Sequence, residues 1–294
     1  MDEVTRVREF NRAVTRRLGV LEDRFLGRSR PLGAARLLFE IGHEGAEVRQ
    51  LRTRLGLDSG YVSRMLRDLE REGLVEVGTS PGDGRVRVVR LTGAGGREVD
   101  ELDRRSDAFA AAMLEPLTPA QRERLVTAMG DVERLLLAST VTIAPADAAG
   151  ADARWCLGRY FAELAERFDT GFDPGQSLPF SAADFTPPAG VFLMATADGG
   201  PVGCAALKVT APGTGYIKRM WVAPRARGSG LGRRILDALE AQAADMGLTT
   251  LQLETNRTLT EAIALYRARG YREVAPFNDE PYADHWFEKR LPAT

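Results

Sequence analysis

Hydrophobic residues recur every three or four positions along much of the first half of the chain, which is the spacing typical of amphipathic helices. The first such stripe lies within residues 4–25 and consists of Val4, Val7, Phe10, Val14, Leu18, Leu21 and Phe25. Two more helices are predicted over residues 94–115 and 119–138, and the second opens with Thr118-Pro119-Ala120-Gln121, a capping box with proline at the first helical position. The first stripe is long for a helix that is buried within one chain, so we expect it to form a dimer interface. Burial of the three long helices against one another within a single chain is the alternative.

A shorter helical pattern lies between these long helices. One helix ends near Leu55, the turn Gly56-Leu57-Asp58 follows, and the next helix runs from Ser59 to Glu72 with Gly73 as its stop. Two short helices joined by such a turn predict a helix-turn-helix, whose second helix enters the major groove of DNA. Its apolar face consists of Val62, Met65, Leu66 and Leu69, and the residues left to contact DNA are Ser59, Tyr61, Ser63, Arg64 and Arg67.

A hairpin is predicted directly after the second short helix. Residues 75–77 and 86–91 form its strands around the turn-rich tip at residues 78–85, and Arg85 and Arg87 share one face of the second strand. A basic hairpin beside a recognition helix is typical of a wing that reaches phosphates or a minor groove. The alternative is a small helical bundle with a solvated arginine face. The net charge of −1 gives no support to DNA binding from overall charge, so the prediction depends on where particular arginines lie.

The pattern changes after residues 138–153, which are small and weakly patterned, and we place a domain boundary there, between residues 144 and 145. A helix over residues 152–168 leads into alternating strand and helix signals. Strands are predicted at residues 191–197, 202–210, 215–222 and 249–255, and helices at residues 231–246 and 259–269. With Asp198-Gly199-Gly200 as a hairpin turn, the second half is expected to be a mixed α/β domain.

The densest motif of the second half is a glycine-rich turn between a strand and a helix, Arg227-Gly228-Ser229-Gly230-Leu231-Gly232. Glycines let backbone N–H groups approach an anion closely, and the amino end of the helix adds partial positive charge. Because Arg225, Arg227, Arg233 and Arg234 surround the turn, we expect a pyrophosphate to bind there. A dinucleotide-binding fold is the competing interpretation, but its fingerprint needs a third glycine at position 233 or 235, where Arg233 and Ile235 stand.

Composition narrows the class of protein. Charged residues make up 28% and hydrophobic residues 44% of the chain, which is ordinary globular composition. The scattered Cys156, Cys204, His43 and His285 exclude a disulfide scaffold and argue against a metal site. No apolar run approaches the roughly 18 residues of a membrane helix. The acidic start is unlike a signal peptide, so we expect a cytoplasmic protein without a membrane partner.

The first 140 residues or so resemble the MarR family of winged-helix transcription regulators. The resemblance rests on the order of the elements, on residues 57–75, and on a wing signature formed by Asp83, Arg85, Leu91 and Thr92. It implies a homodimer joined through the terminal helices of the domain and a palindromic operator in double-stranded DNA. The residues expected to contact DNA from the wing are Asp83, Arg85 and Arg87.

Residues 150–292 or so resemble the GNAT superfamily of acetyltransferases. Arg227, Gly230 and Gly232 fill its Gln/Arg-x-x-Gly-x-Gly/Ala pattern, and residues 253–274 resemble its downstream block. The resemblance implies acetyl-CoA as co-substrate, with the hydroxyl of Tyr266 protonating the departing thiolate of CoA. The residues it implies for cofactor binding are Met220, Trp221, Val222, Arg227, Gly228, Ser229, Gly230, Leu231, Gly232, Arg233 and Asn256.

One departure from the GNAT pattern concerns the general base. Many relatives carry a glutamate on the central strand where this chain has Tyr216. An amine with a pKa near 10.4 costs roughly 4–5 kcal/mol to deprotonate at neutral pH, so a base or desolvation is required. Glu254 acting through a water is the candidate catalytic base, and an exposed strand-end carboxylate is the alternative. For Tyr266 the alternative is a tyrosine packed in the core, and His285 is interpreted as a structural residue of the last strand.

These interpretations predict a two-domain chain. A mainly α winged helix-turn-helix domain at residues 1–144 precedes an α/β mixed-sheet acetyltransferase domain at residues 145–294. The expected function is bifunctional: regulation of transcription at an operator, and transfer of acetyl from acetyl-CoA to an amine. The alternatives are a regulator whose second domain senses acetyl-CoA without turnover, and an enzyme for which the winged domain serves only as a dimeriser.

Overall fold

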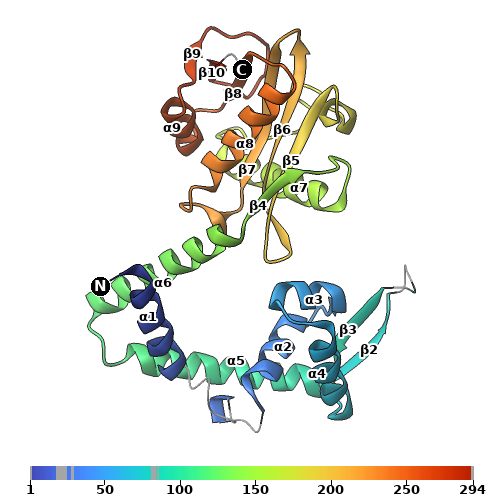
Figure 1. Ribbon diagram of the computed structural model, residues 1–294, viewed down its shortest axis with the longest axis vertical. Coiled ribbons are helices and arrows are strands. Elements are labelled where there is room, and N and C mark those ends of the chain that lie inside the picture. Colours follow the sequence, from blue (N-terminus) through green and yellow to red (C-terminus); the bar gives the residue numbers. More distant parts are fainter. Residues whose placement is uncertain (1, 18–24, 28–29, 81–83, 85, 293–294) are drawn as a thin grey trace. The chain divides into compact units, whose positions relative to one another are not determined.

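The computed structural model describes residues 2–17, 25–27, 30–80, 84 and 86–292, and the chain divides into two compact units, Met1–Thr127 and Ala128–Thr294 (Figure 1). The division falls inside helix α6 (Pro119–Thr140), earlier than the predicted boundary between residues 144 and 145. Leu137 packs against the core of the second unit, and Arg234 donates hydrogen bonds to carbonyl oxygens at the end of α6. Tertiary packing therefore attaches the last turns of the helix to the second unit.

The first unit is built around the helix-turn-helix. Its helices are α1 (Glu3–Arg17), α2 (Leu32–Ile41), α3 (Val48–Leu55), α4 (Ser59–Arg71) and α5 (Gly93–Leu114), with the start of α6. The core is formed by leucines from α2 to α5, namely Leu37, Leu38, Leu51, Leu66, Leu69 and Leu102. Gly56 ends α3 in the left-handed conformation with φ 62°, and Asp58 caps α4 by accepting from the backbone N–H of Tyr61. The predicted turn and both of its helices are confirmed.

The predicted hairpin belongs to a small three-stranded sheet in the order β1-β3-β2. Strands β2 (Val75–Thr79) and β3 (Arg87–Leu91) pair antiparallel, and the two-residue strand β1 (Ala46–Glu47) lies against β3. Neither β1 nor helix α2 was predicted. A strand of two residues is too short to show an alternating pattern, and its pairing partner lies some forty residues further along the chain.

Helix α1 carries the long apolar stripe, and none of its described side chains is buried in the chain. Val4, Val7 and Phe10 are 68%, 58% and 48% exposed. The alternative in which this stripe is buried within one chain is therefore wrong for the described part of the helix. At the predicted end of the helix, Phe25 lies in a 3-10 turn, Phe25–Gly27, in which Leu26 has a φ of 52°. Leu18 and Leu21 lie outside the described residues.

The second unit contains a seven-stranded mixed sheet in the order β4-β5-β6-β7-β8-β10-β9. All neighbours are antiparallel except β7 and β8, which are parallel and joined through helix α8. The strands are β4 (Thr142–Pro145), β5 (Gly190–Ala197), β6 (Gly200–Ala211), β7 (Thr214–Val222), β8 (Thr250–Thr255), β9 (Arg272–Val274) and β10 (His285–Arg290). Strand β4 lies in the stretch that was interpreted as a linker.

Helices cover both faces of this sheet. They are α7 (Ala151–Arg167), α8 (Leu231–Asp245) and α9 (Thr260–Ala268). Alternate residues of β5 point to opposite faces, so Leu193 joins the core beneath α8, whereas Phe192 joins a second core beneath α7. The predicted strands at residues 191–255 and the three helices are confirmed to within two residues at each end.

Candidate functional sites

The parallel strands β7 and β8 part from each other at the centre of the sheet. Their pairing runs from Thr214 opposite Thr250 to Tyr216 opposite Gln252 and does not continue along these fully described strands. The opposite edge of β7 is irregular as well, because its register with β6 shifts between Lys218 and Trp221. Arg219, inside that shift, has a φ of 58°, a left-handed conformation that non-glycine residues seldom adopt. Separation of the two strands opens space between their carboxyl ends.

Two cavities occupy this space. The larger, of about 420 Å³, is bordered by Met220, Trp221 and Val222 of β7, by the glycine-rich turn, and by α7 and α9. The smaller, of about 90 Å³, is bordered by residues 217–220, residues 254–256 and an aromatic wall from α7 and the loop after it. Six residues line both cavities: Tyr160, Leu164, Met220, Leu259, Ala262 and Tyr266. The two spaces therefore adjoin at Met220 and Tyr266.

The glycine-rich turn forms one end of the larger cavity. Gly228 and Gly230 have φ values of 75° and 79°, so the backbone uses conformations that favour glycine, and Gly230 is the N-cap of α8. The first N–H groups of α8 have no acceptor within the helix and are directed out of its amino end. A Cβ at Gly232 would lie 3.4 Å from Leu265 and 3.8 Å from Met220, which line the cavity. These features are suited to an anion with an extended, partly apolar body.

The four arginines predicted around the turn have different roles. Arg233 is exposed on the wall of the larger cavity, and Arg227 reaches Glu163 of α7 and the carbonyl oxygen of Val222. Arg225 lines a separate hollow beside Arg134. The expectation for Arg234 is wrong: its guanidinium donates to the carbonyl oxygens of Ala138 and Val141, 2.8 Å and 2.9 Å away. Because Arg234 follows Arg233 by one position in the helix, its side chain points away from the larger cavity and toward the end of α6.

Tyr266 stands on α9 with its ring in the main core and its hydroxyl at the junction of the cavities. It is 6% exposed, and the hydroxyl lies 3.8 Å from the sulfur of Met220. Burial, and then the charge of Glu254, raise the pKa of this tyrosine well above its ordinary value. The hydroxyl therefore keeps its proton at neutral pH, so both interpretations of Tyr266, packing in the core and donation into the cavity, are compatible with its position.

Glu254 is buried, which corrects the alternative of an exposed strand-end carboxylate. Its side chain is 4% exposed and forms an ion pair with the ammonium of Lys218. The hydroxyl of Tyr216, which stands where many relatives carry a glutamate, donates a hydrogen bond to the same carboxylate. Asn278 donates in turn to the Tyr216 hydroxyl, at 2.7 Å. Glu254 is thus the centre of a buried polar network.

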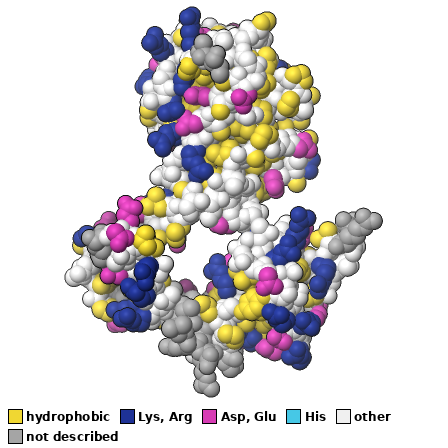
Figure 2. All heavy atoms as spheres, in the orientation of Figure 1, with side chains coloured by type: hydrophobic (Ala, Val, Ile, Leu, Met, Phe, Trp, Pro, Cys, Tyr) yellow, Lys and Arg dark blue, Asp and Glu magenta, His cyan; other side chains and the backbone are white. Residues whose placement is uncertain are grey.

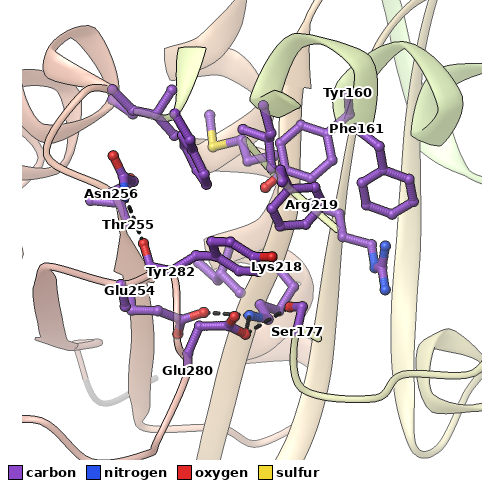
Figure 3. A pocket seen from close by; sticks show the side chains of 18 of the residues that line it. Tyr160, Phe161, Ser177, Lys218, Arg219, Glu254, Thr255, Asn256, Glu280 and Tyr282 are labelled. Atoms are coloured by element: carbon purple, nitrogen blue, oxygen red, sulfur yellow. Dashed lines mark hydrogen bonds and ion pairs between the residues drawn. The ribbon is translucent and has the colours of Figure 1, made fainter. Parts of the chain in front are cut away.

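Sequence reasoning missed the other charged members of the smaller cavity. Lys218 also pairs with Glu280, which lies in the loop between β9 and β10, at 2.9 Å (Figure 3). Arg219 packs on the ring of Phe161, with 4.9 Å between the guanidinium carbon and the ring centroid. Lys218 and Arg219 stand at the start of the segment that resembles the central GNAT strand, but no motif contains Glu280, which comes to Lys218 from 62 positions away. The one available signal was the pair of charges at residues 218 and 219 within an otherwise buried strand.

Three further predicted residues lie outside the larger cavity. The amide of Asn256 donates to the carbonyl oxygen of Tyr282 and accepts from the backbone N–H of Thr258, and it borders the smaller cavity. Ser229 donates its hydroxyl hydrogen to the carbonyl oxygen of Ala226. His285 pairs with Glu273 on strands β10 and β9, at 2.6 Å, in keeping with its interpretation as a structural residue.

The predicted DNA-contacting residues of α4 lie on one side of that helix. Val62, Met65, Leu66 and Leu69 are buried, as the apolar pattern predicts. On the other side Ser59, Tyr61, Arg64 and Arg67 are exposed and Ser63 is half-buried. Figure 2 shows several basic side chains over the part of the first unit that carries α3, α4 and the hairpin. Arg87 is exposed at the tip end of β3, whereas Asp83 and Arg85 lie outside the described residues.

Comparison with known proteins matches each unit to a family. A profile of the acetyltransferase (GNAT) family matches residues 159–271, and a profile of the MarR family matches residues 26–86. An HTH-type transcriptional regulator of Bacillus subtilis, itself uncharacterised, is 29% identical over 91 residues, which are 30% of this chain and 56% of that protein.

Relatives of the second unit are acetyltransferases. The IAA acetyltransferase of Azospirillum brasilense is 45% identical over 92 residues, 31% of this chain and 59% of that protein. An aminoglycoside N(6')-acetyltransferase of Stenotrophomonas maltophilia is 34% identical over 110 residues, 35% of this chain and 71% of that protein. The chain spans 59% and 61% of the length of two of its curated relatives.

Solved structures also resemble the second unit. An acetyltransferase of the GNAT family from Staphylococcus aureus gives a TM-score of 0.45 at 16% identity, over 52% of this chain and 99% of that one. An N-acetylglutamate synthase from Neisseria gonorrhoeae, solved with coenzyme A and N-acetyl-glutamate, gives 0.40 at 23% identity, over 52% and 35%. Within the described ranges, no helix is long and apolar enough to span a membrane, and no group of side chains is arranged to hold a metal ion.

Proposed function

Because the chain belongs to the GNAT acetyltransferase family through its second unit and to the MarR family through its first, we propose that it is a bifunctional regulator and acetyltransferase. It binds an operator in double-stranded DNA and transfers acetyl from acetyl-CoA to an amine. The observation that carries the enzymatic part is the meeting of two cavities at Met220 and Tyr266, one bordered by a bare backbone turn and the other by buried charges. Both activities are assigned to the cytoplasm, where DNA and acetyl-CoA occur together.

The larger cavity fits acetyl-CoA. N–H groups of the turn at residues 228–233 would bind the pyrophosphate, with Arg233 as an added cation. The backbone of Met220 to Val222, which is not paired to β8 in the described strands, would hold the pantetheine. Gly232 borders the path between them, because a long side chain there would point at Met220, Val222 and Leu265. When bound, acetyl-CoA supplies an activated acyl group as a thioester.

The chemical step is assigned to the junction of the cavities. An amine held in the smaller cavity faces Tyr266, whose protonated hydroxyl donates to the departing sulfur. Holding the two reactants in adjoining spaces supplies much of the rate enhancement. Deprotonation of an amine with a pKa near 10.4 costs roughly 4–5 kcal/mol at neutral pH. Glu254, acting through a water, remains our candidate base, although its ion pair with Lys218 weakens it.

The first unit is proposed to bind DNA as a homodimer. The exposed apolar residues of α1, Val4, Val7 and Phe10, offer surface for a second copy. Two-fold symmetry then places two copies of α4 on the two halves of a palindrome. Arg64 and Arg67 are positioned for base edges or phosphates, and Arg87 for the phosphates beside the hairpin.

Two measurements test this function. Titration of acetyl-CoA by calorimetry, followed by a screen of amines for thiol release, tests the enzyme; a protein that ignores coenzyme A would overturn it. A gel shift against the chain's own upstream region, at several salt concentrations, tests the regulator. Acetyl-CoA binding without thiol release, accompanied by a change in operator affinity, would instead identify a sensor. Weak DNA binding that is independent of sequence would leave the first unit as a dimeriser.

A further inference from the structure

We propose that the acetyl acceptor is a free α-amino acid with an apolar side chain, whose ammonium binds Glu280 and whose carboxylate binds Arg219. The proposal rests on the proposed acetyltransferase function, since it names the substrate of that same site. It is carried by three features of the smaller cavity: an unbalanced buried charge cluster, a guanidinium without an anionic partner among the described residues, and an aromatic wall.

The charge cluster has one cation for two anions. Lys218 is 12% exposed and pairs with both Glu254 and Glu280, whose side chains are 4% and 5% exposed. One ammonium facing two carboxylates leaves a net charge of −1 in a space largely closed to water. A buried charge is costly unless it is paired, so the cluster is complementary to one further cation.

The two oxygens of Glu280 are unequally satisfied. Oε2 accepts hydrogen bonds from the hydroxyl of Ser177, the backbone N–H of Leu178 and the ammonium of Lys218, at 2.8, 3.2 and 2.9 Å. Oε1 is buried and has no donor among the described residues. A buried acceptor without a donor costs about 1–3 kcal/mol, and more for a charged group. An amine with hydrogens to donate would satisfy both the vacant acceptor and the charge of the cluster.

Burial would by itself raise the pKa of Glu280, but the Lys218 ammonium and the hydrogen bonds from Ser177 and Leu178 outweigh it and lower the pKa. The carboxylate is therefore charged at neutral pH. A group with a lowered pKa is a poor proton acceptor, so we assign Glu280 the role of a binding residue rather than that of the base.

Arg219 supplies the opposite charge. Its guanidinium makes no ion pair and no hydrogen bond with any residue that the structure describes, whereas Arg227 and Arg269 of the same unit each pair with a carboxylate. The guanidinium carbon lies over the ring of Phe161 and 6.0 Å from the ring centroid of Phe180. A guanidinium stacked in this way can still bind a carboxylate through two parallel hydrogen bonds. Figure 3 shows this side chain extending beside Phe161, on the side of Lys218 away from Glu280.

An aromatic wall borders the same cavity. Phe161 stacks on Phe172 at 5.7 Å between ring centroids, and Phe172 contacts Tyr282 at 4.8 Å. Phe168 completes the wall. Such a surface contacts an apolar or aromatic side chain favourably and offers no hydrogen-bond partner to a polar one. A lysine within a protein, or a polyamine, carries no carboxylate next to the reacting nitrogen and would leave Arg219 unpaired.

Matched substrates test the proposal. L-Phenylalanine and phenethylamine differ only in the carboxylate, and thiol release with each, at saturating acetyl-CoA, gives the ratio of their kcat/KM values. We expect phenylalanine to be preferred by at least about 100-fold, the equivalent of two hydrogen bonds to a charged group. Valine, leucine and methionine should also be accepted. Equal use of the two compounds, or acetylation of amines that lack a carboxylate while all apolar amino acids are refused, would overturn the proposal.

Two variants assign the roles. Arg219→Gln should abolish the preference by raising KM for phenylalanine, while leaving kcat/KM for phenethylamine within about threefold, as expected for one lost carboxylate contact. Glu280→Gln should raise KM for both compounds, because both carry the amine. Arg272→Gln, which removes an exposed arginine of β9 away from both cavities, is the control. An unchanged preference in Arg219→Gln would refute the assignment of Arg219.

Calorimetry with acetyl-CoA separates this proposal from the proposed function. The dissociation constant of acetyl-CoA should be the same in wild type and in both variants, since neither residue lines the larger cavity. If the wild-type protein does not bind acetyl-CoA, the acetyltransferase assignment itself is refuted. Intact binding and turnover with an unselective acceptor preference would refute the acceptor assignment alone.

Discussion

The hydroxyl of Tyr266 lies 3.8 Å from the sulfur of Met220, at the point where the two cavities of the second unit meet. Met220 belongs to the irregular segment of β7 and Tyr266 to α9, so the junction depends on the separation of β7 from β8. A reacting sulfur in the larger cavity and an amine in the smaller one would both be within reach of this hydroxyl.

Replacement of Tyr266 by phenylalanine should therefore impair chemistry rather than binding. We expect Tyr266→Phe to lower kcat by about 10²–10⁴-fold, the usual contribution of a positioned acid. The dissociation constant of acetyl-CoA from calorimetry should stay within about twofold, because the ring and its packing remain. Tyr271→Phe is the matched control, since Tyr271 is buried 5.9 Å from Tyr266, ring to ring, but lines neither cavity. Unchanged kcat in Tyr266→Phe would assign this tyrosine to the core alone.

The pH dependence of the reaction should not report Tyr266. Burial and the negative charge of Glu254 raise the pKa of Tyr266, so its hydroxyl is protonated below the raised pKa, throughout the range from about pH 6 to 10. An acid that stays protonated causes no decline of kcat as the pH rises in that range. Wild type and Tyr266→Phe should thus give profiles of the same shape and different height. An alkaline decline below about pH 10 that disappears in Tyr266→Phe would contradict the raised pKa.

Gly232 offers the cleaner test of the phosphate-binding turn. Gly230→Glu should also abolish binding, but Gly230 has a φ of 79°, so any side chain there strains the backbone. At Gly232 a Cβ meets its neighbours at ordinary distances. Gly232→Glu should reduce acetyl-CoA affinity by at least about 100-fold, by placing a carboxylate beside the phosphates. Gly232→Ala should retain most of the affinity, and thermal denaturation should show both variants folded. If Gly232→Glu retains its affinity for acetyl-CoA, the pyrophosphate does not bind at this turn.

Arg233 and Arg234 are consecutive but should respond to different assays. Arg234→Gln removes two hydrogen bonds to the carbonyl oxygens of Ala138 and Val141 and should cost about 1.5–3 kcal/mol of unfolding free energy in denaturant titrations. Its acetyl-CoA affinity should change by less than about twofold. Arg233→Gln should do the reverse: it should lower the affinity for acetyl-CoA about tenfold and leave the free energy of unfolding unchanged. A loss of acetyl-CoA affinity in both variants would restore the sequence-based expectation that both arginines face the pyrophosphate.

DNA binding should depend on Arg64 and Arg87 in different ways. Arg64→Ala should cost about 1–3 kcal/mol of operator affinity and relax sequence preference. Arg87→Ala should weaken all sequences alike and lower the slope of log affinity against log salt by about one. Arg71→Ala, at the far end of α4 and ion-paired with Asp68, serves as the control. Gel shifts that are the same for Arg64→Ala and wild type would remove Arg64 from the interface.

Dimerisation should depend on the apolar stripe of α1. Phe10→Glu places a charge within a stripe that is exposed in a single chain, so it should not unfold the first unit. It should shift the molecular mass in sedimentation experiments from dimer to monomer, and operator affinity should fall with it. Arg12→Glu introduces the same glutamate on a different side of the helix and should leave the dimer intact. A monomeric wild-type protein would contradict the proposal outright.

Features that depend on neighbouring residues could be read from the sequence. The turn at Gly56-Leu57-Asp58, the buried face of α4 and the capping box at Thr118 all follow from contacts within four positions, and the structure confirms them. The strands and helices of residues 190–268 were predicted because alternation and helical periodicity are local properties. The glycine-rich turn followed likewise from its own residues.

The smaller cavity depended on the order of strands in the sheet. Strand β10 inserts between β8 and β9, which carries Glu280 to Lys218 across 62 positions, and Ser177 to Glu280 across 103. Such pairings carry no periodic signal, so neither Glu280 nor the aromatic wall was foreseen. The same long-range packing turned Arg234 away from the turn and attached the end of α6 to the second unit.

The sequence by itself therefore determined which segments are helices, which are strands and where a glycine-rich turn leads into a helix, because short-range sterics and hydrogen bonds govern those choices. Only the tertiary structure decided which charges meet in the cavity and which is left without a partner, because burial and pairing arise when distant segments exclude water together.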